Sequence, residues 1–250
     1  MPKYFLLPDE LLSKTAVLTG DDARHLITVM RVVPGDELTI CDGACVDYRC
    51  TVSEISKKNF EVAVSVGDAS RCDTEPGTRV VLFLSLIKRD LLELAIQKCV
   101  ELGVSDIVPM ISERTVVRLE GERAGKTARY KKISEAAARQ SMRGIIPRIW
   151  DAQSFCETFS IFETVGGNSL RVAAHEKERK KTIFSVAKGK RFSNAHVWIG
   201  PEGGFSDKEI SAFAKEGVIP VSLGRRILRS ETAGIAALSS VMLLEDPAFA

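Results

Sequence analysis

The sequence predicts an α/β protein in which a small domain of β-strands precedes a larger domain built on a parallel sheet. Residues 1–70 contain short segments rich in β-branched residues, separated by turns. The rest of the chain alternates continuous apolar segments with helical patterns. The change falls in the polar stretch 68–78, which carries Pro76-Gly77. We therefore expect two domains, residues 1–72 and 73–250.

The composition of the chain excludes several classes of protein. The apolar fraction of 45% and the charged fraction of 27% are typical of a globular protein. No apolar run approaches the ~18–20 residues that span a bilayer, and the first residues do not form a secretion signal. We therefore expect a cytoplasmic protein that does not enter the membrane. The six cysteines form no Cys-x-x-Cys pair, so we expect free thiols and no metal site.

Residues 1–70 are expected to form a small β-barrel. Three strands are predicted, over 38–41, 47–52 and 60–64. A short helix with an Asp cap is predicted over Asp21–Met30. Regular turns between short strands favour a barrel. Some small barrels bind RNA and others do not, so this domain alone leaves the function open.

The larger domain begins with the apolar run Val80–Leu86, which is typical of a strand buried on both faces. A helix over Asp90–Gly103 and a strand over Asp106–Met110 follow, and this order predicts a parallel sheet. Further strands are predicted over 170–174, 197–199 and 218–223, and further helices over 129–143, 206–217 and 230–244. Ser206-x-x-Glu209 is a capping box. The last helix is too apolar to be exposed, so it should pack in the core or at a subunit interface.

The positive charge is clustered although the net charge is only +2. Residues 113–148 contain ten basic and four acidic side chains, and residues 177–191 contain seven and one. Such clusters suit contact with a phosphate backbone. They are equally compatible with solvated surface segments. Lys132, Arg139 and Arg143 are predicted to share one helix face, which favours RNA contact over a solvated face.

Three loops follow the carboxyl ends of predicted strands: His175-Glu176, Gly200–Gly204 and Gly224–Arg229. In open α/β sheets ligands bind at this edge. The glycines let the backbone approach a ligand closely and present its N–H and C=O groups. One such loop could be a tight turn without a ligand, but two together predict a ligand pocket. The chain has no Gly-x-Gly-x-x-Gly and no Walker motif, which argues against a dinucleotide-binding fold and an NTPase.

Two of these segments carry a family resemblance. The run Gly200-Pro201-Glu202-Gly203-Gly204-Phe205, followed by Leu223-Gly224-x-Arg226-Ile227-Leu228-Arg229-x-Glu231-Thr232-Ala233, resembles the RsmE family of the SPOUT superfamily. These enzymes methylate N3 of a uracil in 16S ribosomal RNA. Shorter matches include Arg24-His25 and Ser112-Glu113-Arg114, so the resemblance covers nearly the whole chain. The family often has Arg where Lys3 stands, which puts one RNA contact in doubt.

The resemblance implies a PUA-like N-terminal barrel and a C-terminal SPOUT domain with a trefoil knot. It implies a homodimer formed through the knot, a 16S rRNA or small ribosomal subunit substrate, and S-adenosylmethionine as the methyl donor. The implied cofactor-binding residues are Leu84, Ser85, His175, Glu176, Gly200, Pro201, Glu202, Gly203, Gly204, Leu223, Gly224, Arg226, Ile227, Leu228, Thr232 and Ala233. The basic residues expected to bind RNA are Lys3, Arg24, Arg31, Lys88, Arg89, Arg114, Arg139 and Arg143.

Two catalytic candidates follow the second loop. Arg229 is expected to stabilise the uracil anion as N3 loses its proton. Glu231 could orient Arg229 or accept a proton, but a charge at the N-terminus of a helix is its simpler role. Two other functions stay open: methylation of tRNA by the same fold, and a non-catalytic RNA-binding factor in ribosome assembly. An intact pair of cofactor loops disfavours the second.

Overall fold

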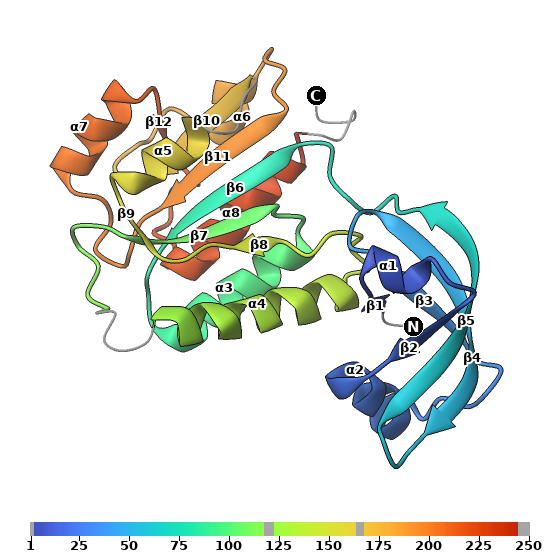
Figure 1. The fold of residues 1–250 in the computed structure, drawn as a ribbon. Coiled ribbons are helices and arrows are strands. Elements are labelled where there is room, and N and C mark those ends of the chain that lie inside the picture. The colour runs from blue at the N-terminus through green and yellow to red at the C-terminus, as the bar shows by residue number, and fades with distance from the viewer. Residues whose placement is uncertain (1–2, 118–122, 164–167, 245–250) are drawn as a thin grey trace. The chain divides into compact units, whose positions relative to one another are not determined.

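The computed structural model describes residues 3–117, 123–163 and 168–244, and the chain divides into two compact units (Figure 1). The first unit comprises Met1–Glu75 with Ala138–Ile146, and the second comprises Pro76–Ala137 with Pro147–Ala250. A single boundary near residue 72 therefore does not describe the whole division. Residues 138–146 join the first unit because they hydrogen-bond to it; the backbone N–H of Lys3 donates to the carbonyl of Arg139 at 3.4 Å.

The first unit is built on a curled five-stranded sheet in the order β1-β3-β4-β5-β2. Its strands are β1 (Tyr4–Phe5), β2 (Thr15–Leu18), β3 (Glu37–Cys41), β4 (Val46–Ser56) and β5 (Glu61–Arg71). β1 pairs in parallel with β3, and the other pairs are antiparallel. Alternating residues of these strands, such as Val62 and Val64, are buried in one core. β4 and β5 are longer than predicted, and β5 continues into the expected linker. The pairing of these two strands is interrupted by register shifts between Tyr48 and Cys50 and between Val52 and Glu54.

The predicted helix over Asp21–Met30 is present as α2 (Gly20–His25), followed by the π-helical turn η1 (Leu26–Met30). The short helix α1 (Pro8–Leu11) was not predicted. The predicted Asp cap is wrong, because Thr19 occupies the N-cap position of α2 and its side chain makes no capping hydrogen bond. Asp21 and Asp22 lie in the first turn instead, where negative charge is favourable near the helix N-terminus.

The second unit contains a seven-stranded sheet, and each of its strand pairs is parallel, as predicted. The order is β12-β10-β11-β6-β7-β8, with β9 also paired to β7. The strands are β6 (Arg79–Ser85), β7 (Asp106–Ile111), β8 (Arg148–Ile149), β9 (Gln153–Ser154), β10 (Ser169–Ala174), β11 (Asn194–Ile199) and β12 (Ile219–Val221). The helices that contribute to this unit are α3 (Arg89–Glu101), α4 (Arg123–Gln140), α5 (Glu157–Glu163), α6 (Ile183–Ala187), α7 (Asp207–Lys215) and α8 (Ser230–Met242).

Each face of the central strand β6 packs against a different layer. Val81 and Phe83 join an aromatic core with residues of α5 and α7, in which the rings of Phe83 and Trp198 stack with centroids 4.4 Å apart. Leu82 and Leu84 point to the other face and approach Gly234 of α8. This alternation explains why the strand reads as a continuous apolar run: neither face is exposed to solvent.

The last helix returns across the sheet. β12 lies at one edge, yet α8 packs against the central strands β6 and β11 and against α3 (Figure 1). The prediction that α8 is buried is confirmed for Ala237, Leu238 and Val241. This return path is one that the implied knot requires. Among the described residues, none of the helices combines the length and apolar character needed to cross a bilayer.

Candidate active site

The three predicted loops meet at one edge of the second unit's sheet. β12, β10 and β11 are parallel neighbours, so the loops that follow them emerge side by side. They surround a pocket of about 250 Å³. The pocket is lined by Ala174, His175, Glu176, Arg179, Ile199, Gly200, Pro201, Glu202, Gly204, Ser222, Leu223, Gly224, Arg226, Ile227, Leu228, Arg229, Ser230 and Ala233.

Most of the residues implied as cofactor-binding line this pocket, but four do not: Leu84, Ser85, Gly203 and Thr232. Ser85 is fully buried, and its hydroxyl lies 3.3 Å from that of Ser112. Leu84 is buried where β6 packs against α8. The lining also contains residues that were not predicted: Ala174, Arg179, Ile199, Ser222 and Ser230. Three of them, Ala174, Ile199 and Ser230, directly flank a predicted loop, so extending each loop by one residue would have found these three.

The loop Gly200–Gly204 has a fixed shape. The hydroxyl of Ser230 donates to the carbonyl of Gly200 at 2.6 Å, and the N–H of Gly204 donates to the carbonyl of Pro201 at 2.9 Å. Gly204 has a φ of +65°, a conformation that favours glycine. A Cβ on Gly200 would lie 3.3 Å from the backbone of Gly204 and from the ring of Phe205. Glycine therefore permits the close fold of this loop at both positions.

The polar groups of the pocket leave one orphaned atom. The His175 side chain is 10% exposed, and within the part of the chain that the structure describes its Nδ1 makes no hydrogen bond. The closest carboxylate oxygen, Oε2 of Glu176, lies 3.4 Å from it. A buried polar atom without a partner is costly, so a ligand that bonded to it would be favoured. Arg226 and Arg229 are exposed at the pocket and add positive charge.

The two catalytic candidates have different surroundings. Arg229 lines the pocket and occupies the N-cap position of α8. Glu231 does not line the pocket; it is 6% exposed and lies in the first turn of α8. The structure thus does not support a catalytic contact for Glu231. Its position fits the simpler role, because a carboxylate is stabilising near a helix N-terminus.

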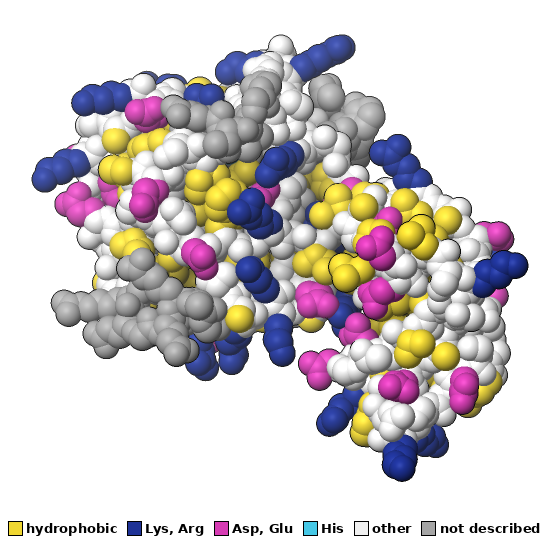
Figure 2. Space-filling view, viewed as in Figure 1, with side chains coloured by type: hydrophobic (Ala, Val, Ile, Leu, Met, Phe, Trp, Pro, Cys, Tyr) yellow, Lys and Arg dark blue, Asp and Glu magenta, His cyan; other side chains and the backbone are white. Residues whose placement is uncertain are grey.

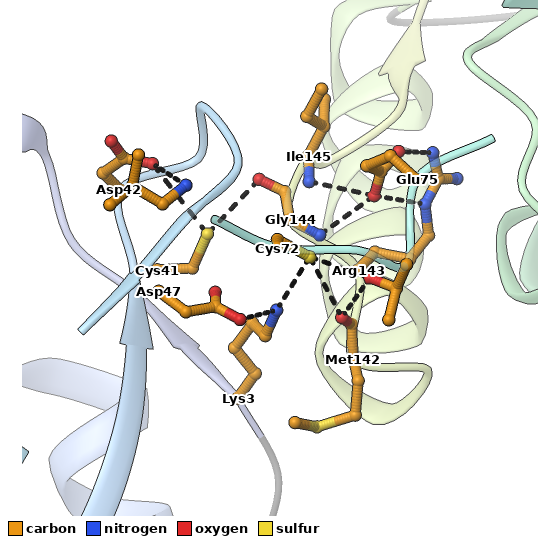
Figure 3. Close-up of polar contacts among 12 residues, drawn as sticks. Lys3, Cys41, Asp42, Asp47, Cys72, Glu75, Met142, Arg143, Gly144 and Ile145 are labelled. Atoms are coloured by element: carbon orange, nitrogen blue, oxygen red, sulfur yellow. Dashed lines mark hydrogen bonds and ion pairs between the residues drawn. The ribbon is translucent and has the colours of Figure 1, made fainter. Parts of the chain in front are cut away.

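Burial corrects the expectation that Lys3 and Arg143 contact RNA. Figure 3 shows the Lys3 ammonium between Asp47, at 2.8 Å, and the thiol of Cys72, at 3.5 Å. Burial opposes its charge, but the ion pair with Asp47 holds the pKa of Lys3 above its ordinary value. Arg143 is 3% exposed and donates to both carboxylate oxygens of Glu75. Both cations stabilise the first unit and are not presented to a phosphate.

All of the remaining basic candidates except Arg139 are exposed, and Arg89 also forms an ion pair, with its Nε 3.6 Å from Oε1 of Glu93. Arg139 is half-buried in an ion pair with Asp22, with Nη2 2.9 Å from Oδ2. Arg114 donates to the carbonyl of Gly203 at 2.8 Å. Arg24, Arg31, Lys88 and Arg89 are exposed, and Arg24 lies over the ring of Phe60. On the face drawn in Figure 2, Lys and Arg side chains gather around β8 and α4 of the second unit, whereas acidic side chains mix with them on the first unit.

Replacing Ser230 with Ala should weaken binding of the pocket's ligand. Ser230 is buried and joins the start of α8 to the loop Gly200–Gly204 through its bond to the Gly200 carbonyl. Loss of one such hydrogen bond costs about 1 kcal/mol, which corresponds to a several-fold rise in the dissociation constant. Titration calorimetry of S-adenosylmethionine, the ligand that the resemblance implies, against the variant and the unaltered protein measures this change. An unchanged dissociation constant would show that this bond does not shape the pocket.

The comparisons with known proteins identify the class of protein as an RNA methyltransferase with a PUA domain. Residues 74–242 match the family described as RNA methyltransferase domain, and residues 18–65 match the RNA methyltransferase PUA domain. The match to the RNA methyltransferase domain begins shortly before β6 and ends at the last residue of α8.

The particular family follows from full-length relatives. The chain is 31% identical to ribosomal RNA small subunit methyltransferase E of Bacillus subtilis, over 96% of each chain. It is 36% identical to the protein of that name from Mesomycoplasma hyopneumoniae, over 67% of this chain and 70% of the relative. The chain belongs to the ribosomal RNA small subunit methyltransferase E family, which confirms the resemblance and the predicted SPOUT and PUA-like fold class.

Solved structures give the same result. A ribosomal RNA small subunit methyltransferase E from Neisseria gonorrhoeae, bound to S-adenosyl methionine, is 28% identical and superposes with a TM-score of 0.83, covering 98% of both chains. A putative methyltransferase from Legionella pneumophila, in complex with the cofactor, is 27% identical, with a TM-score of 0.85 and 97% of both chains covered.

Proposed function

We propose that this protein binds S-adenosylmethionine in the pocket between its three loops and transfers the methyl group to N3 of a uridine in small-subunit ribosomal RNA. The observation that carries the proposal is the convergence of Gly200–Gly204 and Leu223–Arg229 on one pocket at the carboxyl edge of a parallel sheet. Membership of the family supports the reaction type and the rRNA substrate. The family relationship alone supports the choice of N3.

The pocket residues fit this cofactor. The glycine-bearing loops could hold the adenine through hydrogen bonds from their backbone groups, and the apolar residues Ile199, Ile227 and Leu228 line the same pocket. The orphaned Nδ1 of His175 supplies one further polar contact. When bound, S-adenosylmethionine supplies an electrophilic methyl group; the protein's part is to align it with the nucleophile.

To methylate N3, the protein must favour loss of the N3 proton and stabilise the negative charge that develops on the uracil. N3 of neutral uracil carries a proton and is a poor nucleophile, so catalysis must favour its loss. Arg229, exposed at the pocket, can place its guanidinium near O2 or O4 and stabilise the negative charge that develops there. The uridine must be unpaired or flipped out, because N3 is buried in a base pair.

The test is to incubate the purified protein with S-adenosylmethionine and small-subunit RNA from a strain that lacks this methylation, then to map the modified nucleotide by mass spectrometry. We expect one 3-methyluridine. Methylation of tRNA instead would support the alternative substrate. Calorimetry that shows no binding of S-adenosylmethionine would support a non-catalytic assembly factor. Assays on free 16S rRNA and on assembled small subunits would identify the form that is recognised.

Two further properties belong to the proposal. The apolar helix α8 leads us to expect a homodimer, which sedimentation equilibrium would detect. From a ribosomal RNA substrate we also expect the protein to act in the cytoplasm. The first unit is proposed to assist RNA binding through exposed cations such as Arg24 and Arg31.

A further inference from the structure

The loop after β7 is bonded to the proposed cofactor loop through several polar contacts. Ser112–Thr115 follows β7 directly, and Gly200–Ser206 connects β11 to α7. The two segments lie about 90 residues apart in the sequence, yet two hydrogen bonds join them directly and a third joins Glu113 to Glu209 of α7. The sequence suggested RNA binding for Arg114 and only a capping role for Glu209.

Part of this connection is a pair of carboxylates around the start of α7, the buried Glu209 and the exposed Glu113. Glu209 is 5% exposed; its Oε2 accepts from the N–H of Ser206 at 2.8 Å, which completes the predicted capping box. Its Oε1 accepts from the N–H of Glu113 at 2.9 Å. The hydroxyl of Ser206 donates to Oε2 of Glu113 at 2.7 Å. A single capping residue therefore fixes both the helix and the neighbouring loop.

The position of Arg114 follows from this arrangement. Its Nη1 donates to the carbonyl of Gly203 at 2.8 Å. A Cβ added to Gly203 would lie 3.3 Å from Cβ and 3.5 Å from Cδ of Arg114, so the arginine stem packs directly over this glycine. Gly203 does not line the pocket, although Gly200, Pro201, Glu202 and Gly204 do. The hydrogen bond from Arg114 to the Gly203 carbonyl therefore holds the loop at a residue that does not line the pocket.

The turn that carries Arg114 is itself held rigidly. The N–H of Ser112 donates to the Thr115 hydroxyl at 3.0 Å, and the N–H of Thr115 donates to the Ser112 carbonyl at 3.0 Å. Ser112 is buried and hydrogen-bonds to Ser85 at the end of β6. The arginine thus extends from an ordered turn that is connected to the central strand.

We infer that Arg114 and Glu113 are positioning residues of the proposed active site: they set the conformation of the Gly200–Gly204 loop for S-adenosylmethionine and do not contact RNA. This inference rests on the proposed function. A loop that is already ordered loses less conformational entropy when its ligand binds, so its anchors act on affinity for the cofactor. Because the anchors lie outside the pocket, they should affect the rate at saturating cofactor much less than its dissociation constant.

Three variants test the inference: Arg114→Ala, Arg114→Lys and Gly203→Ala. We expect Arg114→Ala to raise the dissociation constant of S-adenosylmethionine about tenfold by calorimetry, with kcat at saturating cofactor reduced less than threefold. Arg114→Lys should recover part of the affinity, because an ammonium can donate one bond to the Gly203 carbonyl. Gly203→Ala should reproduce Arg114→Ala by displacing the arginine stem. Lys208→Ala, on the exposed side of α7, removes the same charge and should change nothing.

The contrary result is equally measurable. The inference is wrong if Arg114→Ala leaves cofactor affinity unchanged but raises the KM for RNA. In that case the slope of log affinity for RNA against log salt concentration should also fall by about 1, which would show that Arg114 contacts a phosphate. The thermal midpoint of each variant without ligand checks folding; we expect Arg114→Ala to stay close to the unaltered protein. If the unaltered protein binds no S-adenosylmethionine, the proposed function fails first. A failure confined to the variants overturns only the inference.

Discussion

Arg229→Ala is expected to reduce methyl transfer about 100- to 1,000-fold while cofactor affinity changes little. This range is typical for loss of one group that stabilises developing charge in a transition state. Arg229 lies at the N-cap position of α8 and lines the pocket, so its side chain can reach the reacting base without supporting the fold. Single-turnover rates with saturating S-adenosylmethionine and RNA measure the chemical step directly.

Two variants make this prediction specific. Arg229→Lys keeps the charge but loses the planar fork, so it should recover only part of the rate. Arg225→Ala removes an exposed arginine of the same loop that does not line the pocket, and should retain most of the activity. Near-normal turnover by Arg229→Ala would remove Arg229 from the mechanism. A large rise in the cofactor's dissociation constant would instead assign it to binding.

The sequence predicted the parallel sheet well because its strands are buried on both faces. Val80–Leu86 could not be mistaken for an amphipathic segment, and the observed strand β6 covers nearly the same residues. The capping box at Ser206 was equally readable, because its two residues act locally. The short elements α1, β8 and β9 were missed, since two to four residues carry no detectable periodicity.

The sequence predicted the positions of the pocket loops better than the roles of individual side chains. Glycine residues identified the pocket loops, because their spacing can be read directly from the sequence. The roles of the basic residues could not be read in this way, because they depend on partners far along the chain. Arg143 meets Glu75, and Arg114 meets Gly203, across separations of 68 and 89 residues. Three side chains that were expected to bind RNA form ion pairs with carboxylates of the first unit instead: Lys3, Arg139 and Arg143.

His196 should make the second unit unstable in mild acid. It lies on β11 and is fully buried; its ring stacks on that of Phe83, with centroids 6.3 Å apart, and is tilted relative to that of Trp198. Burial, together with the charges of Arg171 and Arg79, lowers its pKa from 6.5 to about 4, although Asp106 acts in the opposite direction. Between these two values the unfolded chain binds a proton that the folded chain does not bind. Stability therefore falls as the pH drops from about 6.5 towards 4, by up to about 3 kcal/mol.

Urea unfolding from pH 7.5 to 4.5, followed through the fluorescence of the two tryptophans in the second unit, measures this loss. Carboxylates titrate in the same range, so the informative quantity is the difference between the unaltered protein and His196→Asn. Asn cannot take up the proton, and from pH 7.5 to 5 the variant should lose about 2 kcal/mol less than the unaltered protein. Parallel curves for His196→Asn and the unaltered protein would mean that the imidazole gains its proton without unfolding, and that the layer between β11 and the aromatic core admits a charge.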